Sequence, residues 1–184
     1  MRGRGGRGRL WGDRRGSIAL ELALVLPMLL LLTAGVIEAG LMLMTDATLE
    51  LAVRAATRYG ITGAGGNTRD DAIRGKIGEM MNRWKGENGT LNVEFKAYPS
   101  LDNIGKPEPF NDANDNKVYD AGETFTDVNK NGQWDADMAA ATAGGTGDIV
   151  IYRIRLERPG FTGVLALAGV GTLTFSRQVA VENE

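Results

Sequence analysis

The chain contains neither cysteine nor histidine, and these absences narrow the chemistry that its 184 residues can perform. Zinc sites, haem ligation, cysteine nucleophiles and histidine-based triads all require side chains that are missing. Carboxylates, hydroxyls, amides, lysines and arginines remain, a set that suits calcium binding better than acyl transfer. The lack of disulfides does not argue against export. We therefore expect a protein that is not an enzyme and has no small-molecule substrate.

A net positive charge is lacking outside the first sixteen residues. Residues 1–16 hold six arginines and one aspartate, a local charge of +5, so the overall formal charge of −2 leaves −7 for the rest. A nucleic-acid-binding protein would be expected to carry basic charge on its folded domain. We expect no nucleic-acid partner, and we interpret the glycine- and arginine-rich start as a leader without a core of its own.

A long apolar run follows this basic segment. The 23 residues from Leu22 to Met44 include one charged residue, Glu38, and as a helix they would extend about 35 Å, enough to cross a bilayer. Because the arginines precede the run, the positive-inside rule places the amino terminus in the cytoplasm and the remainder outside. The sequence predicts a single-pass protein of the inner (cytoplasmic) membrane with a periplasmic or extracellular carboxyl-terminal domain.

A cleavable secretory signal peptide is the competing interpretation of this region. The apolar run is longer than a usual signal-peptide core, and no small-x-small cleavage site closes it. Glu21 also lies within its amino-terminal end, where a carboxylate is costly enough to suggest a function. These features favour a membrane helix that stays with the protein.

The segment RRGSIALELALVLPMLLLLTAGVIEAG resembles the start of the TadE-like family of tight-adherence (Flp) pilus assembly proteins, which are similar to type IV pseudopilins. The resemblance implies that a prepilin peptidase cuts between Gly16 and Ser17. Glu21 then becomes the fifth mature residue, which in pilins pairs with the amino terminus of a neighbouring subunit. For Glu38 the resemblance implies a second assembly carboxylate, while its position equally allows a place near the outer interface.

Physical reasoning supports the cut and the role of Glu21. Cleavage would create an ammonium at Ser17, and a carboxylate on an adjacent subunit would compensate that charge among apolar helices. Gly16 has no side chain to obstruct a peptidase. The alternative is an uncleaved signal anchor in which Glu21 lies at the interface.

Beyond the membrane run, the sequence predicts an α+β fold. Apolar residues at helical spacing extend the first helix as a stalk with a stop at Gly60, and residues 68–85 form a second, capped helix. Residues 91–98, 148–157 and 172–181 alternate as strands of an antiparallel sheet of three or more strands. Residues 161–171 are apolar and glycine-rich, which suits a buried loop, a short helix or a patch that faces a partner. The predicted domains are a leader at 1–16, a transmembrane and stalk helix at 17–62, and an extracytoplasmic domain at 63–184.

An acidic insertion at 107–138 contains the most specific chemical pattern. Its Asp and Asn residues recur after fifteen positions, and Glu108 with Phe110 matches Glu123 with Phe125. The alternating oxygen side chains resemble calcium loops of the EF-hand and dockerin type. The predicted ligands are Asp112, Asn114, Asn116, Val118, Asp120 and Glu123 in the first loop, and Asp127, Asn129, Asn131, Gln133, Asp135 and Asp137 in the second, with Val118 and Gln133 contributing backbone carbonyls.

Two departures from the calcium pattern are visible. Lys117 replaces the usual glycine at the sixth position of the first loop, and the twelfth position of the second loop is Met138. Asp137 or a ligand from elsewhere would then have to complete the second loop. The alternative is an acidic surface loop in which Asp and Asn side chains cap their own backbone. We expect the two loops to bind Ca²⁺, and we expect the ion to have a structural role.

Together these features predict a minor pilin or pseudopilin of a type IVc-like pilus that functions in adhesion or secretion. Its expected partners are the membrane, a prepilin peptidase and other pilus assembly proteins. The alternative is an uncleaved, membrane-anchored surface protein whose calcium-stabilised domain binds a partner.

Overall fold

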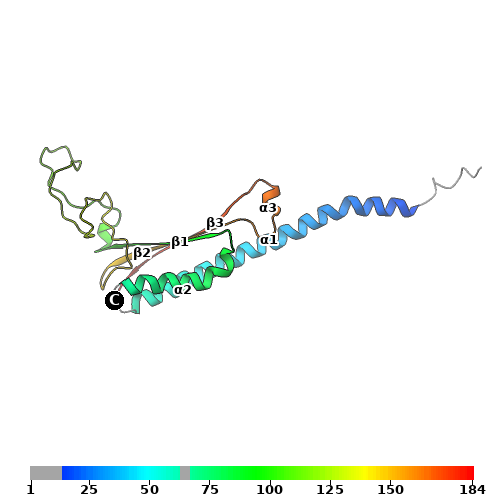
Figure 1. Ribbon diagram of the computed structural model, residues 1–184, viewed down its shortest axis with the longest axis horizontal. Helices are drawn as coiled ribbons and strands as arrows, with labels where there is room; N and C mark the ends of the chain where they lie inside the picture. The colour runs from blue at the N-terminus through cyan, green and yellow to red at the C-terminus, as the bar shows by residue number, and fades with distance from the viewer. Residues whose placement is uncertain (1–13, 63–66) are drawn as a thin grey trace, which may run out of the picture. The chain divides into compact units, whose positions relative to one another are not determined.

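The computed structural model describes residues 14–62 and 67–184 of the chain (Figure 1). The predicted leader, up to residue 13, and residues 63–66 of the predicted linker lie outside the described residues. The helices are α1 (Arg14–Thr62), α2 (Asn67–Lys85), the 3-10 turn η1 (Leu101–Asn103) and α3 (Val164–Leu167). The strands are β1 (Thr90–Tyr98), β2 (Ile149–Arg158) and β3 (Leu173–Glu182).

Helix α1 joins the predicted membrane run and stalk in one element of 49 residues. It continues through Pro27, which membrane helices tolerate because neighbouring groups can satisfy the freed carbonyl. Gly60 does not stop the helix, which reaches Thr62. One glycine in a helix costs about 1 kcal/mol relative to alanine, too little to end it.

The three strands form an antiparallel sheet in the order β1-β2-β3. The register aligns Phe95 with Tyr152 and Leu156 with Phe175, so these buried side chains share one face. Charged and polar residues alternate with them on the other face. The period-two pattern of the sequence therefore predicts the sheet and its buried side correctly, with strand ends within about one residue.

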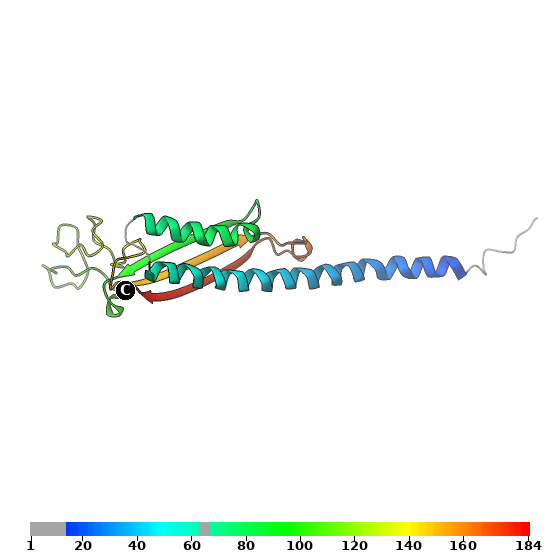
Figure 2. The same cartoon turned by 90° about the horizontal axis from the view of Figure 1, so that it is seen from below.

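Two helices cover the buried face of the sheet (Figures 1 and 2). Helix α2 contributes Ile73, Ile77 and Met81, all fully buried. The carboxyl-terminal part of α1 contributes a stripe at helical spacing that includes Leu49 and Ala56. This second helix and the antiparallel sheet confirm the α+β architecture; the calcium-loop insertion remains a prediction.

The described residues group into two compact units. The first contains α1 up to Met42 together with Gly160–Gly171, the connection between β2 and β3. The second contains Leu43–Pro159 and Thr172–Glu184, and so holds the sheet, α2 and the acidic insertion. Of the three structures that the sequence allows for residues 161–171, the chain adopts a connection with a short helix, α3.

The acidic insertion begins and ends at one point of the second unit. The backbone N–H of Met138 donates to the carbonyl of Lys106 at 2.9 Å, so the two ends of the insertion lie side by side. Just beyond, Ala140 forms an isolated antiparallel bridge with Ala97 near the end of β1. The sheet therefore presents the insertion at the end where β1 finishes and β2 begins.

Candidate functional site

The two halves of the acidic insertion pair through a short antiparallel bridge. Phe110 bridges Phe125, and two backbone hydrogen bonds of 2.8 Å, Asn111 N to Thr124 O and Thr126 N to Pro109 O, flank it. The paired residues are fifteen positions apart, which is the period of the repeat. The tandem pattern in the sequence thus becomes two loops held back to back.

Repeated aromatic residues supply the small core of the insertion. Tyr119 stacks on Trp134 with ring centroids 4.5 Å apart and planes inclined by 12°. Phe110 meets both rings edge-on, at 5.8 Å and 5.9 Å. Such aromatic contacts stabilise by roughly 0.5–1.5 kcal/mol beyond burial. Because each half contributes to this cluster, neither loop is expected to fold without the other.

In the first loop, acidic side chains organise the backbone around them. Asp112 accepts hydrogen bonds from Asn116 N at 3.1 Å and Lys117 N at 2.6 Å. Asp120 Oδ2 accepts from the side-chain amides of Asn114 and Asn116, both at 2.8 Å. Lys117 has a φ of 64°, so it adopts the left-handed conformation normally supplied by glycine at this position.

The second loop repeats the same contacts fifteen residues later. Asp127 accepts from Asn131 N at 3.1 Å and Gly132 N at 2.8 Å. Asp135 Oδ2 accepts from the amide of Asn129 at 2.7 Å and from that of Asn131 at 2.5 Å. The loops are therefore equivalent in geometry as well as in sequence.

Val118 and Gln133, the residues predicted to contribute backbone carbonyls, also occupy equivalent positions in the two loops. The backbone N–H of Val118 donates to Asn116 Oδ1, and that of Gln133 donates to Asn131 Oδ1, both at 2.7 Å. Each Asn side chain that the sequence predicts as a ligand is thus already oriented by its own loop.

Each loop is closed by a glutamate that accepts hydrogen bonds from backbone N–H groups near the two ends of that loop. In the first loop Glu123 accepts from Ala113 N at 2.9 Å and Asp120 N at 3.0 Å. In the second loop Glu108 accepts from Val128 N at 2.7 Å and Asp135 N at 3.1 Å. Glu108 is completely buried, whereas Glu123 is half-buried. The first loop is therefore closed by the glutamate at its own end, and the second loop by a glutamate that precedes the first loop in the sequence.

The role of Glu108 was not predicted from the sequence. The match of Glu108 to Glu123 across the repeat was the available signal, but in sequence order Glu108 precedes both loops. Only the antiparallel pairing brings it to the second loop.

The hydrogen bonds describe a self-capped acidic loop, the alternative to calcium that the sequence allows. In the described parts of the chain, no group of three or more acidic side chains is placed to hold a metal ion. The amide nitrogens of the Asn residues point to Asp120 and Asp135, where an ion would require their oxygens. Calcium binding therefore stays a prediction.

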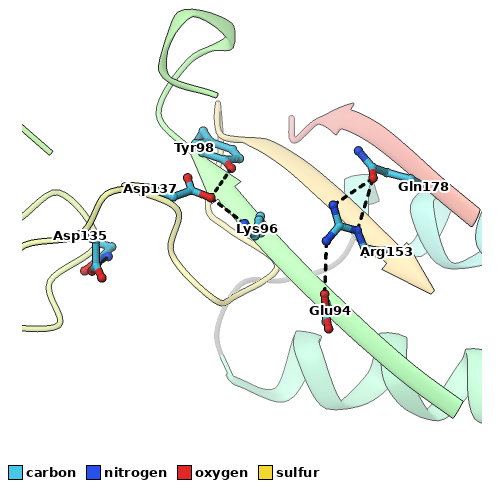
Figure 3. Close-up of polar contacts among 8 residues, drawn as sticks. Glu94, Lys96, Tyr98, Asp135, Asp137, Arg153 and Gln178 are labelled. Carbon is cyan, nitrogen blue, oxygen red and sulfur yellow. Dashed lines mark hydrogen bonds and ion pairs between the residues drawn. The ribbon is translucent and has the colours of Figure 1, made fainter. Parts of the chain in front are cut away.

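Asp137 is directed toward the sheet instead of the second loop (Figure 3). Its Oδ2 lies 2.6 Å from Lys96 Nζ and accepts a hydrogen bond from the Tyr98 hydroxyl at 3.2 Å. Burial opposes ionisation of Asp137, but the hydrogen bonds from Lys96 and Tyr98 prevail and lower its pKa. The hydrogen bond to Asp137 raises the pKa of Lys96, and burial followed by this carboxylate raises the pKa of Tyr98. This cluster fastens the end of the insertion to β1.

A second polar set crosses the exposed face of the sheet (Figure 3). Arg153 on β2 lies 3.8 Å from Glu94 on β1, and its guanidinium donates to Gln178 on β3 at 3.3 Å and 3.4 Å. All three strands are therefore linked on this face by solvent-accessible contacts that contribute little individually.

The amino-terminal part of α1 has the properties of a membrane span. It lies within a helix from Ile18 to Tyr59 that is long and apolar enough to cross a bilayer. Between Ile18 and Ile37 its large apolar side chains are exposed. Glu21 is also exposed, and the predicted junction between Gly16 and Ser17 lies in the first turn of α1.

Glu38 differs from Glu21 because its carboxylate is engaged inside the chain. Its side chain is 2% exposed. Oε1 accepts from Phe161 N at 2.8 Å, while Oε2 accepts from Thr162 N at 2.7 Å and from the Thr162 hydroxyl at 2.6 Å. These short, charge-assisted bonds join the helix to the β2–β3 connection within the first unit. The assembly role predicted for Glu38 stays a prediction.

Comparison with known families concerns this helical region. Residues 16–58 match the family model described as TadE-like protein. The amino-terminal segment is TadE-like. The resemblance inferred from the sequence is thereby confirmed, and it indicates involvement in Tad pilus assembly. No curated protein and no solved structure matches the chain.

The TadE-like segment contains Gly16, Ser17, Glu21 and Glu38, so every residue predicted for cleavage or assembly lies within the match. The sheet and the acidic insertion lie outside it. The TadE-like family is structural and not enzymatic, which agrees with the expectation that this protein has no catalytic role.

Proposed function

We propose that this protein is a minor pilin or pseudopilin of a tight-adherence (Flp, type IVc-like) pilus, processed by a prepilin peptidase and assembled for adhesion or secretion. The observation that carries the proposal is the TadE-like match over residues 16–58, which begins at the predicted cleavage junction. The exposed apolar surface of α1 supports it, because this surface requires lipid or neighbouring helices to cover it. The protein acts by assembly and performs no catalysis.

In this proposal Glu21 directs the assembly of the mature chain. After cleavage, the ammonium of Ser17 is a charge that apolar helices in a filament would bury. The Glu21 carboxylate of an adjacent subunit compensates it, and an isolated charge of either sign would be strongly unfavourable there. The exposure of Glu21 leaves it accessible to another subunit.

The mature amino terminus tests this proposal. The full chain is co-expressed with a prepilin peptidase, purified from membranes and analysed by mass spectrometry. A chain that begins at Ser17 supports processing, whereas a chain that retains Arg14 and Arg15 contradicts it. Gly16→Leu is expected to block the cut. Glu21→Gln is the matched control, because it should be cut normally and yet be lost from assembled pili.

The alternative is an uncleaved single-pass surface protein with a partner-binding domain. One observation favours it: α1 begins at Arg14, so the Gly16–Ser17 junction lies in helical backbone. A peptidase acts more readily on an extended segment, and cleavage would first require the first turn of the helix to unwind. Retention of the leader in the experiment above would select this alternative.

We further propose that the acidic insertion binds structural Ca²⁺ at its two loops. The supporting observation is that the two loops contain equivalent sets of oxygen side chains, one set in each loop, at the sequence spacing that calcium requires. Because Asp137 is engaged by Lys96 and Tyr98, we assign the closing position of the second loop to Glu108. The proposed ligands are Asp112, Asn114, Asn116, Val118 carbonyl, Asp120 and Glu123 in one loop, and Asp127, Asn129, Asn131, Gln133 carbonyl, Asp135 and Glu108 in the other.

Thermal unfolding of the full chain in detergent micelles tests the calcium proposal. Millimolar Ca²⁺ should raise the unfolding temperature, and EDTA should reverse the change, because an ion that binds only the folded loops stabilises them. Asp120→Asn and Asp135→Asn should each reduce the shift. Asp102→Asn, an exposed acidic position outside the loops, is the control. Identical unfolding with Ca²⁺ and EDTA would rule out the proposed sites.

A further inference from the structure

The connection between β2 and β3 is unusually apolar for a surface loop. No charged residue lies between Arg158 and Arg177 in the sequence. Within this connection Leu167 of α3 is 78% exposed and Val170 is 40% exposed. Loops in water are normally polar, and a contiguous exposed apolar patch marks an interaction surface.

This connection is fastened to the membrane helix. Residues 160–171 and α1 up to Met42 form one compact unit, and α3 lies beside α1 in both views (Figures 1 and 2). The carboxylate of Glu38 accepts the backbone N–H groups of Phe161 and Thr162. Gly160 permits this approach, because a Cβ there would lie 3.0 Å from Glu38 Oε1.

The length of the apolar helix places this contact at a membrane boundary. Counted from Leu22, where the apolar run starts, 20 residues end at Leu41 and extend about 30 Å as a helix, which equals the thickness of a bilayer's hydrocarbon core. Glu38 lies in the last turn of this stretch. A carboxylate at that depth is tolerated when it is hydrogen-bonded, and here it also satisfies two backbone N–H groups that lipid could not.

From these observations we infer that residues 160–171 form a lipid-binding wedge that lies in the interfacial region of the bilayer beside α1. Leu167 and Val170 contact the acyl chains, and Glu38 holds the wedge at the correct depth. The partner is the lipid surface, because the exposed apolar side chains of the wedge belong to the same compact unit as the exposed apolar face of α1, which includes Val36 and Ile37. The inference rests on the proposed membrane insertion of α1. It does not depend on cleavage, filament assembly or calcium.

Because the chain has no cysteine, a single introduced thiol can report the location of each side chain. The full chain carrying Leu167→Cys is labelled with an environment-sensitive fluorophore and reconstituted in phospholipid vesicles. Some vesicles contain lipids with a nitroxide quencher at a shallow or a deep acyl position, and iodide serves as the aqueous quencher. Val170→Cys is the second variant, in case one substitution prevents folding.

Two matched positions serve as controls. Leu30→Cys, in the middle of the apolar helix, should be quenched best by the deep nitroxide. Val118→Cys, an exposed aliphatic position in the acidic insertion, should be quenched by iodide alone. For Leu167→Cys and Val170→Cys we expect quenching by the shallow nitroxide to be at least twofold stronger than by the deep one, with little effect of iodide.

The controls separate the possible failures. If Leu30→Cys responds to lipid quenchers while both wedge probes respond to iodide, the wedge is wrong and the membrane span stands. If the wedge probes are shielded from iodide and from lipid quenchers, another protein chain covers them, which also overturns the inference. If Leu30→Cys does not respond to lipid quenchers, the proposed membrane insertion fails and the wedge falls with it.

Discussion

Glu38 shows how one side chain joins two segments that are far apart in the sequence. Its carboxylate is almost completely buried and accepts hydrogen bonds from the backbone N–H groups of Phe161 and Thr162. These donors are separated from Glu38 by 123 and 124 positions in the sequence. Each such bond to a charged group contributes about 1.5–3 kcal/mol in favourable settings. Without this carboxylate the N–H groups of Phe161 and Thr162 would lose their acceptor.

We therefore expect Glu38→Ala to loosen the β2–β3 connection. Amide hydrogen exchange at Phe161 and Thr162 should become roughly tenfold faster or more, which corresponds to about 1.4 kcal/mol or more of lost protection. The measurement is hydrogen exchange of the full chain in micelles. Glu50→Ala is the control on the same helix, because Glu50 is exposed and pairs with Arg54 four residues away. Equal exchange in both variants would contradict the assigned role of Glu38.

Lys117 illustrates a local conformational cost. Its φ of 64° lies in the left-handed region, where the matching residue of the second loop is Gly132 with a φ of 82°. A non-glycine residue in this region costs roughly 1–2 kcal/mol, partly offset by the greater freedom that glycine has in the unfolded chain.

Lys117→Gly should accordingly stabilise the protein by about 0.5–1 kcal/mol, as the difference between these two terms. Chemical denaturation followed by Trp134 fluorescence provides the measurement, because Trp134 stacks in the core of the insertion. Lys106→Gly is a suitable comparison, since Lys106 is not among the positive-φ residues, and it should be neutral or slightly destabilising. A destabilised Lys117→Gly would mean that the side chain of Lys117 contributes more than its backbone costs.

Among the elements, the two acidic loops depend on each other. Glu108 closes the second loop from a buried position, whereas Glu123 closes the first loop from a half-buried one. Burial makes an unsatisfied partner more costly, because a buried N–H that loses its acceptor cannot bond to water instead. The two equivalent glutamates should therefore differ in their contribution.

Glu108→Gln is expected to destabilise the insertion by about 1–3 kcal/mol, and Glu123→Gln by less. The amide that replaces one carboxylate oxygen presents a donor to a backbone N–H, which leaves that N–H unpaired. The free energy of unfolding of both variants is measured in EDTA, so that metal binding does not contribute. If Glu123→Gln proved the more costly change, the closing role assigned to buried Glu108 would be wrong.

The end of the insertion and strand β1 are joined by a contact that depends on pH. The pKa of Asp137 is lowered in the folded protein, so its ionised form stabilises the fold above the unfolded pKa of about 4. This contribution is lost as pH falls through the lower, folded pKa. The pKa of Lys96 is raised in the folded protein, so Lys96 affects stability at alkaline pH. Its contribution is lost as the pH rises through this raised pKa.

Asp137→Asn should lower stability at neutral pH by a few tenths to about 1 kcal/mol, because about a third of the Asp137 side chain is exposed. The difference from the natural chain should shrink when unfolding is measured below about pH 4. Asp102→Asn is again the control, and it should show a smaller difference at neutral pH. A difference for Asp137→Asn that did not change between pH 7 and pH 3 would contradict the ion pair.

Across the whole molecule, the acidic insertion is an excursion whose two ends meet. Lys106 and Met138 are hydrogen-bonded through their backbones, and the aromatic cluster gives the insertion its own small core. The sheet and helices bury a separate set of residues. The framework of helices and strands should therefore not require the insertion.

Replacement of residues 108–136 by a short glycine-serine linker should leave the helical and sheet content and the membrane attachment unchanged. Circular dichroism and vesicle flotation provide the two measurements. Replacement of residues 149–158, which form the central strand, should abolish the fold in the same assays. If the first replacement also abolished the fold, the insertion would be part of the main core.

Local patterns in the sequence were sufficient for the membrane helix, the second helix, the three strands and the repeat in the insertion. Helical spacing and period-two alternation are properties of neighbouring residues, so they predict an element wherever it later packs. The TadE-like segment is identifiable for the same reason, since its leader, Glu21 and apolar run are contiguous. The sequence alone thus determined the elements and the TadE-like character of the amino-terminal segment.

Only the tertiary structure decided which distant side chains meet. Glu38 is joined to residues beyond β2, Glu108 to the second acidic loop, and Asp137 to β1. Each contact depends on how the chain returns to itself, through the sheet register or the antiparallel pairing of the loops. The residue spacing within one segment cannot predict these contacts, because their geometry is set by packing between segments that are far apart in the chain.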